Sequence, residues 1–238
     1  MEHHRHARTV RLSIAATDPL SPGLVQSVND VCDRVEDASA ESVVLIQLAT
    51  GPGATEDDRH SGAVSVRLVS RWERAVRRLE RLPAPVLATV HGDCAGPAME
   101  VLLATDYRIA LSLARFRLHR GSGSVWPGMS LHRLVHQLGP TRARRLALMG
   151  TVLTAEDAVS WGVVDETVGE AALPNTVEGA TRALTRMRGQ DLSVLRRLLL
   201  DAVSTDFDDA LGVHLAACDR SLRRSANPET ALLVGEQT

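Results

Sequence analysis

Apolar residues alternate with polar ones over residues 8–15, which predicts a strand with one buried face. Nearly continuous apolar runs at 43–49 and 85–90 are typical of strands that are covered on both faces. The same pattern predicts shorter strands at about 106–110, 115–119 and 163–168.

Apolar residues spaced three and four apart predict helices between these strands. The first helix follows Ser21 and Pro22, an N-cap residue and a proline suited to the first helical position. A long helix at about 63–81 has an apolar inner face and an arginine-rich outer face. That outer face either meets CoA phosphates or a partner protein, or is simply solvated. Further helices are predicted at about 97–104, 129–138, 140–149, 154–161 and 170–224, the last with a break at Gly189-Gln190.

Strand–helix repeats therefore come first and helices come last, which predicts an α/β core at 8–168 and a C-terminal helical subdomain at 169–238. A polar, glycine-containing loop is predicted at 50–62. The C-terminal part carries an apolar face that either packs on its own core or mediates assembly. Its residues are Leu195, Leu198, Leu199 and Val203.

The amino-acid composition excludes several classes of function. The 238 residues carry a formal net charge of −2, which gives no support for bulk nucleic-acid binding. All 27 basic residues are arginine, so a lysine Schiff base is excluded. The three cysteines are far apart, and no metal site is indicated. His3, His4 and His6 either bind a metal or belong to a frayed terminus. No apolar run reaches the ~20 residues of a membrane span, and we expect a cytoplasmic protein.

The stretch HGDCAGPAMEVLLATDYRIA, residues 91–110, carries the candidate chemistry. Gly96 permits a turn that other residues avoid, and Pro97 suits the start of a helix. Glu100 then lies in the first turn, where the helix dipole favours a carboxylate. Taken alone, Glu100 is either a helix-capping charge or a catalytic acid/base.

The wider sequence resembles the crotonase (enoyl-CoA hydratase/isomerase) superfamily. The resemblance covers about residues 43–168. The similar blocks are LPAPVLATVHG, AGPAMEVLLATDYRIA, ARF, WPG, LHRLVHQLGPTRARRLALMG and TAEDAVSWGVVDETV. It implies a crotonase-like ββα superhelix core, a C-terminal helical trimerisation subdomain, an acyl-CoA substrate, and a homotrimer or hexamer. CoA enters as part of the substrate, and no separate cofactor is expected.

Typical members bind the thioester carbonyl in an oxyanion hole of two backbone N–H groups. The family's three turn glycines fall on Gly96, Pro97 and Ala98. The second of these supplies one N–H group, which Pro97 lacks. Losing one such donor typically costs about 3–4 kcal/mol in the transition state. The motif that supplies the other donor is not recognisable in this sequence.

The resemblance also implies two catalytic glutamates. The first falls on Glu100, and the second falls on Arg120, which follows His119. His119 is either a replacement acid/base, since its charge can change near neutral pH, or a surface histidine at a strand end.

Finer features resemble the DpgB-type branch, hydratase homologues that accompany a type III polyketide synthase in antibiotic biosynthesis. This resemblance implies a role in forming 3,5-dihydroxyphenylacetyl-CoA from a polyketidyl-CoA intermediate. The branch has an aspartate where this chain has His91. We place His91, Asp93, Arg120 and Trp126 in a possible substrate pocket.

Three hypotheses follow. The protein is a lyase-like enzyme that dehydrates and aromatises a CoA-bound polyketide, with Glu100 as its main acid/base. Alternatively, it is a non-catalytic, degenerate crotonase that binds and activates the synthase. An ordinary enoyl-CoA hydratase is opposed by Pro97 and Arg120.

Overall fold

The computed structural model describes residues 8–38, 42–51, 64–121, 124–186 and 189–226. Most of the predicted loop at 50–62 and the N-terminal histidines lie outside these residues. The chain divides into two compact units, Met1–Gly189 and Gln190–Thr238, which are described separately.

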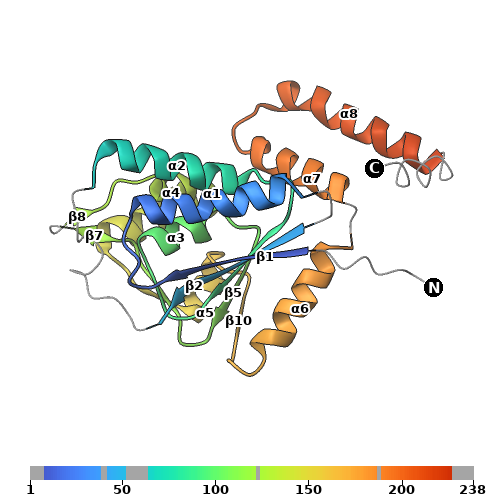
Figure 1. Ribbon diagram of the computed structural model, residues 1–238. Helices are drawn as coiled ribbons and strands as arrows, with labels where there is room; N and C mark the ends of the chain where they lie inside the picture. Colours follow the sequence, from blue (N-terminus) through green and yellow to red (C-terminus); the bar gives the residue numbers. More distant parts are fainter. Residues whose placement is uncertain (1–7, 39–41, 52–63, 122–123, 187–188, 227–238) are drawn as a thin grey trace. The chain divides into compact units, whose positions relative to one another are not determined.

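The first unit is built on a five-stranded parallel sheet (Figure 1). Its order is β1 (Arg8–Ala15), β2 (Ser42–Thr50), β3 (Val86–Val90), β5 (Tyr107–Leu111) and β10 (Glu166–Val168). Side chains alternate between its two faces: Ile46 and Leu48 of β2 enter the main core, whereas Leu45 and its neighbour Leu87 enter a smaller cluster. Both faces are therefore covered, as the continuous apolar runs predict.

Helices α1 (Pro22–Glu36) and α2 (Val66–Glu80) lie on the face with the main core (Figure 1). Ser21 caps α1 by accepting a hydrogen bond from the backbone N–H of Leu24, as the sequence predicts. Arg78 of α2 forms ion pairs with Asp33 and Glu36 of α1. One of the outer-face arginines is thus a link between helices rather than a purely solvated charge.

Helix α4 (Ser130–Met149) contains a kink at Gly139, which has a φ of 78° and is followed by Pro140. Because a proline starts a helix well and interrupts one, the kink produces the two predicted helical segments. The next helix, α5 (Ala155–Trp161), begins with a capping box between Thr154 and Asp157.

Short strands complete the first unit. The predicted strand at 115–119 is reduced to β6 (Arg115–Phe116), which pairs with β4 (Asp93–Cys94) and β9 (Leu153–Thr154). β7 (Arg120–Gly121) and β8 (Ser124–Val125) form an antiparallel pair.

The predicted C-terminal helical stretch is divided differently from the expectation. α6 (Leu173–Leu184) packs on the smaller apolar cluster of the sheet and belongs to the first unit. The compact units divide at Gly189/Gln190. The domain boundary at 168/169 stays a prediction. α6 ends at Leu184 and α7 (Gly189–Ala202) begins at Gly189, so the helical stretch is interrupted just before the predicted break at Gly189-Gln190. A further break precedes α8 (Phe207–Ala226). Among the described residues, no helix combines the length and apolar character needed to cross a membrane.

Candidate functional site

The turn between β4 and α3 (Pro97–Leu102) positions Glu100. Gly96 caps the helix with a φ of 56°, a conformation that glycine adopts readily. Pro97 follows at the first helical position, and the backbone N–H of Glu100 donates to the carbonyl of Gly96. The local sequence thus forms the predicted turn and places the carboxylate in the first helical turn.

Glu100 is buried, with 6% of its surface exposed. The indole N–H of Trp72, on the inner face of α2, donates a hydrogen bond to Glu100 Oε2. Trp72 is itself 1% exposed. Sequence periodicity identifies Trp72 only as a core residue, because nothing in the spacing shows that its polar edge meets Glu100.

The surroundings of Glu100 perturb its ionisation. The pKa of Glu100 is raised to about 7, mainly by burial and to a smaller extent by the negative charge of Glu73. The hydrogen bond from Trp72 and the positive charge of Arg133 lower the pKa, but they do not offset burial. The protonated and ionised forms are both populated near neutral pH, which suits a group that must give and take protons.

A small, partly open cavity adjoins the carboxylate. Its volume is about 10 Å³, close to the space that a single water molecule needs. The described residues that line it are Gly96, Met99, Glu100, Leu118, His119, Trp126 and Ser130.

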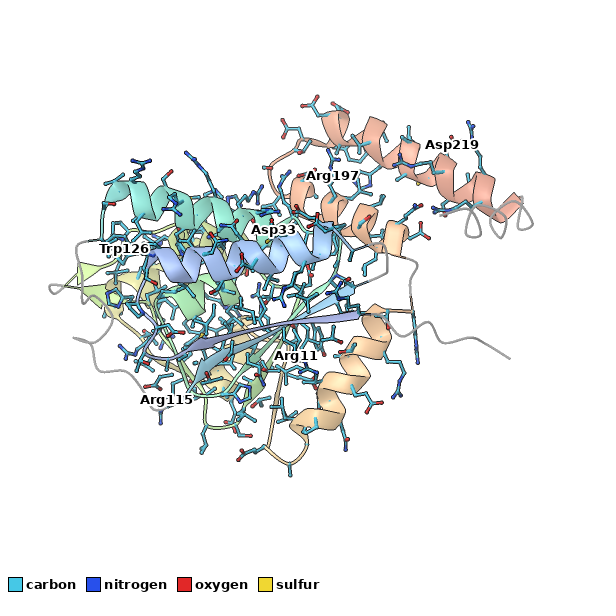
Figure 2. The ribbon with its side chains drawn as sticks, in the orientation of Figure 1. Arg11, Asp33, Arg115, Trp126, Arg197 and Asp219 are labelled. Carbon is cyan, nitrogen blue, oxygen red and sulfur yellow. The ribbon has the colours of Figure 1, made fainter. Side chains whose placement is uncertain are left out.

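The cavity brings together four predicted site residues: Gly96, Glu100, His119 and Trp126. His119 is 6% exposed, so its interpretation as a surface histidine is wrong. Figure 2 shows Trp126 at the end of the sheet where β7 and β8 lie.

Gly128 lies against both Glu100 and Trp126. A Cβ atom built on Gly128 would be 2.8 Å from Glu100 Oε1 and 2.8 Å from Trp126 Nε1. Both distances are shorter than real Cβ contacts, so a side chain at this position would displace the carboxylate and the indole. The glycine of the WPG segment is therefore required for the close packing around the carboxylate.

A buried ionic network holds α4 against α2 beside this site. Arg133 Nη1 lies 3.2 Å from Glu73 Oε2, and Arg133 Nε lies 3.6 Å from Glu80 Oε1. Glu73 also accepts a hydrogen bond from the backbone N–H of Met129 at 3.3 Å. No sequence motif indicates this network, because its members are polar residues within otherwise ordinary helical patterns.

The remaining candidate site residues do not line this cavity, or their side chains are outside the described part of the structure. His91 Nε2 is 2.9 Å from Thr89 Oγ1, and burial lowers the pKa of His91. Neither His91 nor Asp93 is among the described residues that line the cavity, and nor are Pro97 and Ala98. The side chain of Arg120 lies outside the described part of the chain. Their roles in binding stay predictions.

Comparison with known proteins identifies the family. Residues 16–226 match the enoyl-CoA hydratase/isomerase family. An enoyl-CoA hydratase of Amycolatopsis orientalis is 40% identical over 215 residues, which cover 90% of this chain and 96% of that protein. A 1,2-epoxyphenylacetyl-CoA isomerase of Escherichia coli strain K12 is 31% identical over 140 residues, covering 58% of this chain and 53% of that protein.

The fold agrees with this match. The crystal structure of an enoyl-CoA hydratase from Bacillus anthracis has a TM-score of 0.82, with 21% identity, and covers 98% of this chain and 95% of that one. The chain therefore belongs to the enoyl-CoA hydratase/isomerase family and has the predicted α/β crotonase fold. Its function is enoyl-CoA hydratase-like, and an acyl-CoA substrate is consistent with the family.

Proposed function

We propose that the protein acts on a CoA thioester with Glu100 as its main acid/base. The observation that carries this proposal is the state of Glu100: a buried carboxyl group with a pKa of about 7, beside a water-sized cavity. A group with this pKa protonates a leaving hydroxyl and removes a proton at neutral pH with comparable ease. Dehydration requires both transfers.

The substrate in this proposal is a CoA-bound polyketide that loses water and becomes aromatic, as in 3,5-dihydroxyphenylacetyl-CoA formation beside a type III polyketide synthase. The half-buried indole of Trp126 lines the cavity beside Glu100 and offers an apolar surface near the carboxylate. The similar Escherichia coli protein is named for a phenylacetyl-CoA derivative, which favours the same class of acyl group.

Aromatisation also fits the weakened oxyanion hole. The forming ring makes the reaction favourable, so positioning and one acid/base group supply a larger share of the catalysis than in simple hydration. This reasoning accommodates Pro97, which cannot donate a backbone hydrogen bond.

A non-catalytic role is the second candidate. In this alternative the protein binds and activates the synthase. Two observations favour it: the cavity beside Glu100 has room for only about a water molecule, and an open groove of about 510 Å³ follows the arginines of α2. The groove is lined by Ser70, Glu73, Arg74, Arg77, Arg78, Arg81 and Met129.

Reconstitution of the synthase separates these candidates. Product formation is measured with the wild type, with Glu100→Gln, and with Glu178→Gln, which changes an exposed carboxylate of α6 as a matched control. The catalytic proposal expects stimulation to fall by roughly 10²-fold or more with Glu100→Gln alone. Undiminished stimulation by this variant supports the activator role instead. Robust hydration of crotonyl-CoA by the wild type would show an ordinary hydratase.

We also propose assembly into a homotrimer or hexamer through the apolar face of α7. Leu195 and Leu199 of α7 and Val203 directly after it are exposed in the single chain, and exposed apolar patches often mark interfaces. Light scattering tests this: Leu199→Glu is expected to yield a smaller species, and an unchanged mass would count against the interface.

A further inference from the structure

Two histidines lie one helical turn apart at the start of α4. His132 and His136 are both exposed, and the four-residue spacing puts them on one face of the helix. Arg133, between them in sequence, is buried and pairs with Glu73 on α2. The histidine face is therefore separate from the face that packs toward Glu100, and neither histidine lines the cavity there.

The two imidazoles converge on each other. His132 Nε2 and His136 Nε2 are 3.0 Å apart, and the ring centroids are 4.2 Å apart. A hydrogen bond at this distance needs a proton on one nitrogen and a lone pair on the other. A metal ion can take the place of that proton when both Nε2 atoms present lone pairs.

The separation of the nitrogens also fits a metal ion. Zinc–imidazole bonds are about 2.0–2.1 Å long, so two such ligands at right or tetrahedral angles lie about 2.9–3.4 Å apart. The observed distance is within this range, so the two nitrogens are already spaced as ligands of one ion. Histidines at this helical spacing are a recurrent zinc-binding arrangement.

We propose that His132 and His136 bind one divalent transition-metal ion of the Zn²⁺, Ni²⁺ or Cu²⁺ class. Imidazole favours these ions over Mg²⁺ or Ca²⁺, which prefer oxygen ligands. No group of three or more metal-ligating side chains occurs among the described residues, so water fills the remaining coordination positions. On binding, the Nε2 proton moves to Nδ1 through solvent or is released, and each nitrogen donates one lone pair.

The bound ion would stabilise the first turns of α4. This segment begins at Ser130, which lines the Glu100 cavity, and contains Arg133, which joins α4 to α2. A ligand that binds only the folded state stabilises it by an amount that grows with the logarithm of ligand concentration, so metal should raise the resistance of the protein to unfolding.

The test uses Zn²⁺ as the probe and isothermal titration calorimetry as the measurement. Because His3, His4 and His6 can also bind metal, all proteins carry glutamine at these three positions. In this background we expect one Zn²⁺ per chain, and His136→Gln should weaken binding by roughly tenfold or more because chelation is lost. Mg²⁺ should give no heat of binding.

His214→Gln is the matched control, since His214 is an exposed histidine of α8. It should leave Zn²⁺ affinity unchanged, and the thermal unfolding midpoint should rise with Zn²⁺ in the control but not in His136→Gln. Failure of the background protein to bind Zn²⁺, or equal affinity in His136→Gln and His214→Gln, overturns the proposal. Circular dichroism verifies that each variant is folded, and the exposed positions make loss of folding an unexpected result.

Discussion

The raised pKa of Glu100 has a measurable effect on stability. In the unfolded chain this carboxyl group ionises near its ordinary pKa of 4.5, whereas in the folded protein it ionises at about 7. Between these values the unfolded state is ionised and the folded state is not. The stability of the wild type therefore falls as the pH rises from 4.5 through 7, relative to a variant with no ionisable group at this position.

The expected size follows from the two pKa values. A difference of roughly 2.5 in pKa corresponds to about 3 kcal/mol in the free energy of unfolding. Glu100→Gln keeps a carbonyl acceptor for the Trp72 indole N–H while removing the charge. The variant should therefore gain about 3 kcal/mol over the wild type on going from pH 4 to pH 8.

Urea unfolding followed by tryptophan fluorescence measures this difference. All three tryptophans, Trp72, Trp126 and Trp161, belong to the first compact unit, so the signal reports on the unit that contains Glu100. Other titrating groups are common to both proteins and cancel in the comparison. A difference between the two proteins that does not change from pH 4 to pH 8 would refute the raised pKa and the acid/base role built on it.

Three further changes test the surroundings of Glu100. Gly128→Ala should lower the free energy of unfolding by about 1–3 kcal/mol in urea titrations, because its Cβ would crowd the carboxylate. Its control is Gly179→Ala, in open space on α6, which should raise the free energy of unfolding by roughly 0.5–1 kcal/mol. Trp72→Phe removes the donor that lowers the pKa of Glu100, so the pH-dependent fall in stability should move to higher pH; an unmoved profile contradicts the contact. Arg133→Met leaves two α2 carboxylates without this cation, and denaturation should show a loss of about 3 kcal/mol; a neutral effect would show that the network is not stabilising.

Local sequence patterns were sufficient to predict most of the helices and strands. The stripe of α1, the capping by Ser21 and Thr154, and the kink near Gly139 depend on residues within a few positions of one another. The placement of Glu100 in the first turn of α3 is of the same kind, because Gly96 and the following proline define that turn. Such features are set by backbone sterics and short-range hydrogen bonds, which the sequence displays directly.

Contacts between elements required the tertiary structure. Trp72 and Glu100 are 28 positions apart in the sequence. Only the packing of the folded chain brings the indole N–H of Trp72 to the carboxylate. The close approach of Gly128 to Glu100 and Trp126 also depends on contacts between elements that are distant in sequence. The packing of α6 on the smaller apolar cluster of the sheet depends on such contacts as well.

The sequence by itself determined the family, the strand–helix order and the candidate carboxylate. The tertiary structure decided how that carboxylate ionises, because burial and charges from α2 and α4 set its pKa. It also decided that His132 and His136 converge, since helical spacing permits such a pair but side-chain rotamers determine whether the nitrogens meet. Periodicity fixes which face a residue occupies, whereas the chemistry of a site depends on what the neighbouring elements bring to that face.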